Sequence, residues 1–153
     1  MKTTRRLLKL FCCLGLAYSA LIFNPFWPTW GKNHDHFADG NYISYTATNL
    51  SAFLRDECFS SFQHVSAILS LVFLYVGIVL VLIAIATSGK KKVSFVFSIL
   101  AASLLLAVTC LLPFSHDISI PFLWLNYMIP ALSGGLLIAS NFVGEKATLK
   151  RGY

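Results

Sequence analysis

Apolar runs separated by short polar segments, and by one long one, organise this chain of 153 residues. The runs cover residues 7–26, 65–87, 93–112 and 121–143. The second run has 23 residues and no charge, and as a helix it would be about 35 Å long, enough to cross an apolar bilayer core of about 30 Å. A backbone in lipid must satisfy its own hydrogen bonds, so this run is predicted to be a helix despite its many β-branched residues. The pattern predicts an all-α membrane protein in which a four-transmembrane-helix bundle forms a single domain over residues 1–153.

The polar segments predict how these helices are connected. Residues 88–92, Ser-Gly-Lys-Lys-Lys, form a tight basic turn. Pro113 is expected to end the third helix, and Pro121 suits the first turn of the fourth. Residues 27–64 form the long hydrophilic segment, the outer loop. Within it, the side chains of residues 41–48 would alternate between the two faces of a strand, and the segment is rich in β-formers. This predicts a small extracellular β-containing loop.

Composition and charge agree with a membrane protein and indicate its orientation. Hydrophobic residues make up 57% of the chain and charged residues 12%, against about 25% charged residues in soluble domains. Ten of the twelve Lys and Arg fall within residues 2–9, 90–92 and 146–151, which lie on one side of the predicted bilayer. The positive-inside rule then places both termini in the cytosol, and we expect a multi-pass protein of the plasma membrane. The net charge of +6 does not indicate nucleic acid, because the basic residues are not interleaved with aromatics on one face.

The first apolar run has a second interpretation, as a cleaved signal peptide. A basic start precedes an apolar core and small residues at Ala17, Ser19 and Ala20, which is the layout of a cleavage region. The apolar run continues through Phe23 past that region, and this favours an uncleaved first span. In both interpretations the loop that follows lies outside.

The outer loop carries residues that suggest function. Asn49-Leu50-Ser51 is a sequon on the predicted outer side, so Asn49 is a candidate glycosylation site. Trp27 and Trp30 end two Pro-x-Trp steps, and together with Trp124 they fit an interfacial aromatic belt. Residues 34–36, His-Asp-His, resemble metal ligands, but we interpret them as part of a solvated loop. No metal and no cofactor is expected.

The spans are informative through what they lack. Residues 65–87, 93–112 and 121–143 contain no Asp, Glu, Lys, Arg or His. Transporters and membrane-embedded enzymes usually keep ionisable residues at this depth, so the protein is predicted not to be an enzyme. Polar and small residues in the fourth span are predicted to hold helices together or to contact a second copy; they are Asn126, Ala131, Gly134, Gly135 and Ala139. Cys12 and Cys13, near the cytosolic end of the first span, are candidates for palmitoylation or for apolar packing.

Short motifs together resemble the claudin-like tetraspan superfamily, which includes claudins, peripheral myelin protein and the epithelial membrane proteins. Pro25-Phe26-Trp27 at the outer end of the first span is similar to that family's Pro-x-Trp. Cys58 resembles the second cysteine of its loop pair, and Gly134-Gly135-Leu136-Leu137 resembles a motif of the claudin fourth span. The likeness covers the whole topology. The chain lacks the family's Gly-Leu-Trp and its first loop cysteine, so the family's loop disulfide is not expected, although Cys110 is a conceivable partner for Cys58.

The resemblance implies a non-catalytic glycoprotein whose partners are the lipid bilayer and another membrane protein or further copies of itself. Its expected role is that of an accessory subunit, or of cell adhesion and membrane organisation through the outer loop, where Trp27, Trp30 and Cys58 would be structural. A MARVEL-type vesicle membrane protein is the main alternative, because it shares the topology. A small membrane transporter or enzyme is a further alternative, which the absence of ionisable residues in the spans disfavours.

Overall fold

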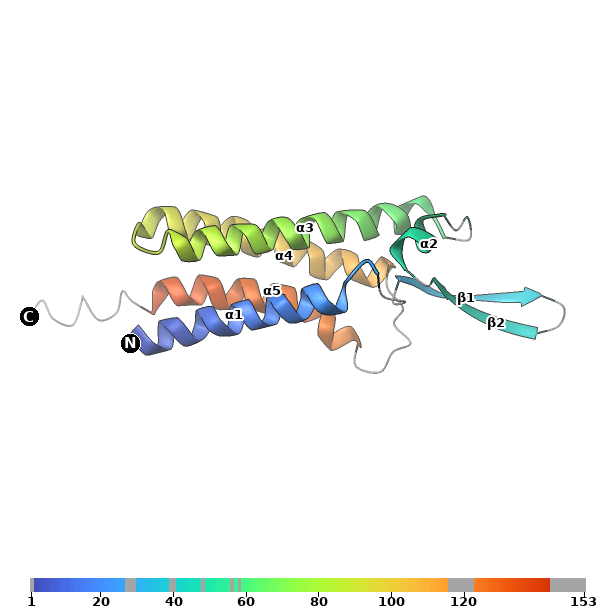
Figure 1. Ribbon diagram of the computed structural model, residues 1–153, viewed down its shortest axis with the longest axis horizontal. Coiled ribbons are helices and arrows are strands. Elements are labelled where there is room, and N and C mark those ends of the chain that lie inside the picture. Colours follow the sequence, from blue (N-terminus) through green and yellow to red (C-terminus); the bar gives the residue numbers. More distant parts are fainter. Residues whose placement is uncertain are drawn as a thin grey trace, which may run out of the picture.

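The computed structural model is a long bundle of helices with a two-stranded sheet extending from one end (Figure 1). It describes residues 2–26, 30–38, 41–47, 49–55, 57, 59–115 and 123–143, with the backbone alone for residues 2, 31–38, 41–47, 123 and 124. The elements follow in the order α1 (Lys2–Ile22), β1 (Trp30–Ala38), β2 (Asn41–Ala47), α2 (Leu50–Arg55), α3 (Ser61–Ala86), α4 (Lys91–Ser115) and α5 (Leu123–Phe142).

The helix α3 begins four residues before the apolar run, because a polar cap closes its first turn. The Ser60 hydroxyl accepts a hydrogen bond from the Gln63 amide at 3.3 Å, and the Gln63 side-chain oxygen accepts one from the Ser60 amide at 2.9 Å. This reciprocal capping box gives partners to two amides at the helix start. The helix therefore already includes residues 61–64, which the hydropathy pattern assigned to the outer loop. α1 differs in the opposite sense, ending at Ile22 rather than at residue 26.

Prolines lie inside two of the long helices. Pro113 was expected to end the third helix, but α4 continues to Ser115, so that prediction is wrong. A proline this close to the end disturbs only the final turn, which has few further hydrogen bonds to lose. Pro130 lies within α5, and Figure 1 shows α5 changing direction in its first part. The Ala131 amide beside this proline donates a hydrogen bond to the Thr109 hydroxyl on α4 at 3.3 Å, and neighbouring helices often supply such bonds near prolines in membrane helices.

β1 and β2 form an antiparallel hairpin at the end of the bundle opposite the N-terminus (Figure 1). Pairing runs from Ala38 opposite Asn41 to Trp30 opposite Ala47, with an irregularity in register near Trp30. The short helix α2 follows, an element that the hydropathy pattern did not predict. We call this end of the bundle, with the hairpin and α2, the sheet end.

The long helices pack in the order α3, α4, α5, α1, whereas α1 and α3 touch only sparsely. Each of the three packed seams contains a glycine that allows close approach. These contacts are Gly77 with Leu105 between α3 and α4, Gly134 with Ala102 between α4 and α5, and Gly15 with Ser133 between α5 and α1. The fourth seam, between α1 and α3, is left open.

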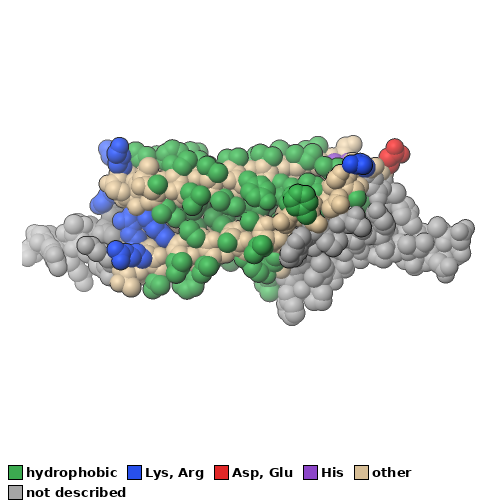
Figure 2. Space-filling model, in the orientation of Figure 1, with side chains coloured by type: hydrophobic (Ala, Val, Ile, Leu, Met, Phe, Trp, Pro, Cys, Tyr) green, Lys and Arg blue, Asp and Glu red, His purple; other side chains and the backbone are tan. Residues whose placement is uncertain are grey.

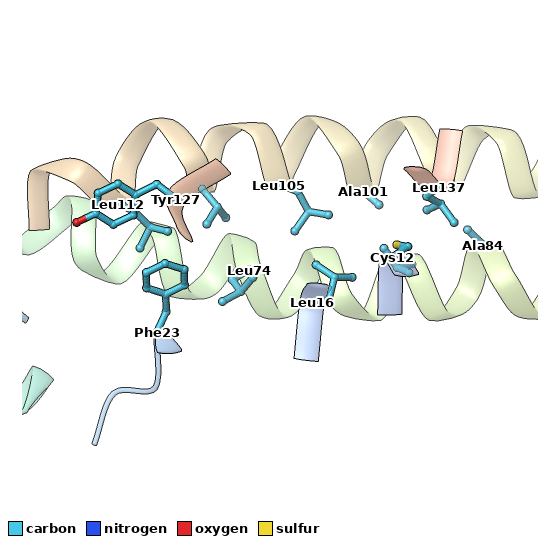
Figure 3. Close-up of a cluster of buried hydrophobic side chains, with 12 residues drawn as sticks. Cys12, Leu16, Phe23, Leu74, Ala84, Ala101, Leu105, Leu112, Tyr127 and Leu137 are labelled. Carbon is cyan, nitrogen blue, oxygen red and sulfur yellow. The ribbon is translucent and has the colours of Figure 1, made fainter. Parts of the chain in front are cut away.

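Apolar side chains lie both inside and outside the bundle. The core joins α1, α3, α4 and α5 through buried side chains that include Cys12, Leu16, Leu74, Leu105 and Leu137 (Figure 3). The outer surface is also largely hydrophobic (Figure 2), with Val72, Val79 and Leu82 on α3 about half exposed. A helix that is apolar on every side is suited to a membrane rather than to water. α3 and α4 are each long and apolar enough to cross one.

Charge separates the two ends of the bundle (Figure 2). Basic residues gather where α1 begins and where α3 passes into α4, an end that we call the basic end; they are Arg5, Arg6, Lys9, Lys90, Lys91 and Lys92. Arg55, the last residue of α2, and Glu57, between α2 and α3, lie at the sheet end. The described length of the bundle between the two ends carries no charged side chain.

Candidate functional site

A buried cluster separate from the bundle core closes the sheet end. Its members are Trp30, Phe53, Phe59, Ala67 and Leu71. They come from the start of β1, from α2, from the segment before α3 and from the first turns of α3. We call this unit the cap. Because its side chains come from several elements, the cap joins the hairpin and α2 to the bundle.

Trp30 is the largest side chain in the cap and is 0% exposed. Its indole Nε1 donates a hydrogen bond to the Asn24 carbonyl at 3.1 Å, so the ring is buried with its polar atom satisfied. The ring is enclosed by protein, whereas the ring of an interfacial-belt tryptophan contacts lipid headgroups. Trp27 and Cys58 lie outside the described residues, and Trp124 is described by its backbone alone.

His64 packs into the cap through its ring. It meets the Phe53 ring edge-on at 5.0 Å between centroids, and Phe53 lies 4.6 Å from the Phe59 ring. The His64 Nε2 is buried and has no hydrogen-bond partner among the described residues. Within the part of the chain whose side chains are described, no three His, Cys, Asp or Glu gather into a metal-binding group. His64 therefore acts in the cap as an aromatic packing residue.

A groove of about 410 Å³ opens on the outside of the cap. It is lined mainly by apolar atoms, from Pro25, Phe26, Asn49, Leu50, Ser51, Leu54 and Arg55. One wall is the segment that leaves α1, and the other is α2. The Leu50 amide donates to the Pro25 carbonyl at 2.9 Å, which holds the two walls together.

Phe26 stands out among the groove residues, because 82% of its side chain is exposed. Its amide donates to the Asn24 side-chain oxygen at 2.9 Å, a local turn that fixes the backbone on which the ring is carried. The Asn24 carbonyl also accepts the Trp30 indole hydrogen bond. The exposed ring of Phe26 is thus presented by a backbone anchored to the cap.

The candidate glycosylation site lies in the same groove. Asn49 is half-buried, and its side-chain oxygen accepts the Ala52 amide hydrogen bond at 2.8 Å in the first turn of α2. Asn is a preferred residue at such a helix start. A glycan would be attached to the side-chain nitrogen, which this bond does not use. The sequon, the helix cap and the groove therefore share one residue.

The residues predicted to pack the fourth span divide into two groups. The Asn126 side-chain oxygen accepts a hydrogen bond from the Tyr18 hydroxyl at 2.9 Å, linking α5 to α1. Gly134 is buried, and a Cβ added there would lie 2.8 Å from the Ala102 Cα. A Cβ added at Gly135 would meet nothing within 4 Å. Ala139 is exposed and Ala131 is partly buried.

The cysteines of α1 occupy different environments, although they are adjacent. Cys12 is 0% exposed within the bundle core, and Figure 3 shows it among side chains of the other helices. Cys13 lines a groove on the open seam between α1 and α3. Burial makes Cys12 a packing residue, whereas Cys13 stands at the surface that α3 leaves uncovered. Cys110 is a free, exposed thiol on α4.

Several structural residues were missed by sequence reasoning. Phe53 and Phe59 of the cap carried no recognisable motif. Gly15 contacts Ser133, and its signal was present in the sequence, because Gly15 and Ser19 are small residues four positions apart in the first span. The start of α3 did carry a signal, because Ser60 followed by Gln63 fits the capping-box pattern.

The described lining of the groove offers mainly apolar contact. The groove has one ionisable lining residue, Arg55, whose guanidinium donates to the Ser51 hydroxyl at 3.1 Å. No family model, curated protein or solved structure matches this chain. The functional argument therefore depends on the geometry of the cap and the bundle.

Proposed function

We propose that this protein is a non-catalytic, claudin-like tetraspan membrane protein that serves as an accessory subunit and recognises another membrane protein through its cap. The observation that supports this most directly is the exposed Phe26 ring beside the apolar groove of the cap. Large aromatic side chains next to apolar pockets are the usual anchors of protein interfaces. The ring is carried on an anchored backbone, so little ordering would be required on binding.

The membrane placement in this proposal has α1, α3, α4 and α5 all crossing the bilayer. α1 and α5 lie alongside the two strongly apolar helices and share one core with them. The charges at the basic end support a cytosolic location for that end, by the positive-inside rule. The sheet end, with Asn49 and Phe26, then faces outward, where a glycan can be added to the sequon.

A binding role fits the bundle better than transport or catalysis. In the described interior the polar side chains are mostly hydroxyls, and they are used in helix contacts. The Ser94 hydroxyl donates to the Ala84 carbonyl at 2.7 Å, and the Asn141 side chain donates to the Ser98 hydroxyl at 2.9 Å. These side chains form hydrogen bonds within the bundle and line no described pocket. A pathway for ions or protons normally keeps ionisable groups at such positions.

The proposal is tested by affinity purification of the full chain in mild detergent, comparing Phe26→Asp with Phe62→Asp. Phe62 is a matched control because it is an exposed aromatic residue of the sheet end, outside the groove. We expect wild type and Phe62→Asp to recover the same larger membrane protein, and Phe26→Asp to lose at least about tenfold, the effect typical of a central anchor. Size-exclusion chromatography checks that both variants remain folded. Equal losses in the two variants, or recovery only of further copies of this chain, would contradict the proposal.

A further inference from the structure

The open seam between α1 and α3 contains an apolar groove of about 210 Å³. Beside Cys13, its walls are formed by Leu16, Ala17, Ala20, Ile78, Val81 and Leu82. The alanines explain the hollow, because small side chains on α1 leave space that α3 does not fill. The other seams are closed by glycine contacts, so this groove marks the side on which the bundle is incomplete.

A basic pocket of about 220 Å³ lies on the same two elements at the basic end. Its lining consists of Arg5, Arg6 and Lys9 from α1 and Ser88 from the turn after α3. The Arg5 Nε is buried and has no hydrogen-bond partner among the described residues. Three cations and a hydroxyl thus meet at one pocket, and no acidic side chain described in the structure lies at this end.

The pocket and the groove are successive parts of one surface. Arg5, Lys9 and Cys13 are spaced four residues apart, so they lie along one face of α1. Along α3 and the turn that follows it, the groove residue Leu82 comes before the pocket residue Ser88. The step from Lys9 to Cys13 is about 6 Å along the helix axis. A basic pocket therefore passes directly into an apolar groove.

We propose that this seam binds one anionic phospholipid, with its headgroup phosphate in the basic pocket and part of an acyl chain in the groove. The headgroup would receive charged hydrogen bonds from Arg5 and Arg6, whose guanidinium groups suit phosphate. The inference rests on the proposed placement of α1 and α3 in the bilayer. Binding a lipid there would fill the one seam that the protein's own side chains leave open.

A lipid fits the surface better than a free phosphate or an acidic protein segment. A free phosphate would need the basic pocket but would have no use for the apolar groove. An acidic segment would need a polar path beyond the pocket, and the surface beyond Lys9 is apolar. A phospholipid matches the two chemistries in the order in which they occur from the end of the bundle toward its middle.

The test compares two triple variants of the full chain, each lacking three positive charges at the basic end. Arg5→Gln/Arg6→Gln/Lys9→Gln removes the pocket, while Lys90→Gln/Lys91→Gln/Lys92→Gln removes exposed charges that do not line it. Each protein is reconstituted with phosphatidylserine and phosphatidylcholine at about 0.15 M salt, where charges are screened beyond about 8 Å. Retained lipid is then counted by native mass spectrometry. We expect wild type and the turn variant to hold one phosphatidylserine, and the pocket variant to hold it at least about tenfold less.

A second arm addresses the groove without changing charge. Ala17→Phe fills the hollow, and Leu14→Phe adds the same ring on an exposed position outside it. We expect only Ala17→Phe to weaken phosphatidylserine retention. Equal loss of bound phosphatidylserine in both charge variants would show diffuse attraction to the leaflet and would overturn the proposal. Lipid retention that Ala17→Phe leaves unchanged, but that inorganic phosphate abolishes, would show a free-anion site and would also overturn it. Release of the protein from membranes by alkaline carbonate would instead refute the membrane placement on which the proposed function depends.

Discussion

Two adjacent glycines in α5 provide a test of how the bundle is packed. A Cβ added at Gly134 would lie 2.8 Å from the Ala102 Cα and 3.0 Å from the Ala102 Cβ on α4. One of these atoms is backbone, so the contact is relieved only if α4 and α5 move apart. A Cβ added at Gly135 would meet no atom within 4 Å. Changing each glycine to alanine therefore makes the same chemical change in a packed environment and in an open one.

The expected difference can be worked out from these contacts. Replacing Gly by Ala inside a helix is favourable by about 0.8–1.0 kcal/mol in helix propensity, and this term is shared by the two variants. Forcing an extra methyl group into a packed contact costs about 1–3 kcal/mol, and this term applies to Gly134 alone. We expect Gly135→Ala to be neutral or stabilised by up to about 1 kcal/mol. Gly134→Ala should be less stable than Gly135→Ala by about 1–3 kcal/mol.

The assay is unfolding in mixed detergent micelles, with increasing sodium dodecyl sulfate and helicity followed by circular dichroism. Ala102→Gly should cost about 0.8–1.0 kcal/mol in helix propensity in either background, but its net cost should be smaller with Gly134→Ala than with Gly135→Ala, because only there does it remove a close contact, at 3.0 Å. The same Ala102→Gly change should not improve Gly135→Ala. The reasoning is refuted if the two alanine variants agree within about 0.5 kcal/mol, the scatter expected of independent sites.

Further predictions concern hydrogen bonds between helices and the fate of α1. Thr109→Val should destabilise the bundle by about 1 kcal/mol, because the hydrogen bond from the Ala131 amide to the Thr109 hydroxyl is lost. Thr109→Ser keeps the hydroxyl and should not destabilise the bundle in the same detergent assay. Tyr18→Phe should cost about 0.6 kcal/mol, the mean for a hydrogen bond between membrane helices, and should cost nothing when Asn126 is already Ala. Intact mass of the purified protein should include residues 1–20, since cleavage after residue 20 would remove Leu16 and its neighbours from the core; a mass beginning near residue 21 would show a cleaved signal peptide.

The positions of the long helices could be read from the sequence, because helices suited to a bilayer require long apolar runs. The residues at which the helices begin and end were harder to predict. α3 extends to Ser61 through the capping box, and α4 passes Pro113 to Ser115, because hydrogen bonding in the first and last turns is local and does not depend on apolar residues. Boundaries placed where hydropathy changes therefore misplace these helix ends by three or four residues.

The packing faces were harder to predict, for a geometric reason. Gly134 and Gly135 are about 100° apart around the helix axis, so only one of them can face α4. A small residue every four positions selects the row of Ala131, Gly135 and Ala139, but the closest approach to α4 is made by Gly134. The face of a helix that packs against its neighbour depends also on the residues of that neighbour. Those residues lie far away in the sequence, so the pattern within one helix does not identify the face.

The cap illustrates the same limitation at a larger scale. Phe26 and Asn49 are prominent in the sequence, within a Pro-x-Trp step and a sequon, but their shared groove requires α2 as its second wall. α2 has only six residues, too few to show a helical period. Its position depends on the Leu50 amide bonded to the Pro25 carbonyl and on Phe53 buried in the cap, which are contacts between segments far apart in sequence.

The distribution of close packing indicates where this protein has surface left for partners. Three seams of the bundle are closed at Gly77, Gly134 and Gly15, where helices approach too closely for another molecule to enter. Within the described part of the chain, the surfaces that remain include the open seam of α1 and α3 and the groove beside Phe26. The seam passes from basic to apolar and so matches a lipid, whereas the groove displays an aromatic ring and so matches a protein. The two surfaces lie on different parts of the bundle, so changes in the basic pocket should leave partner recovery intact, and Phe26→Asp should leave lipid retention intact.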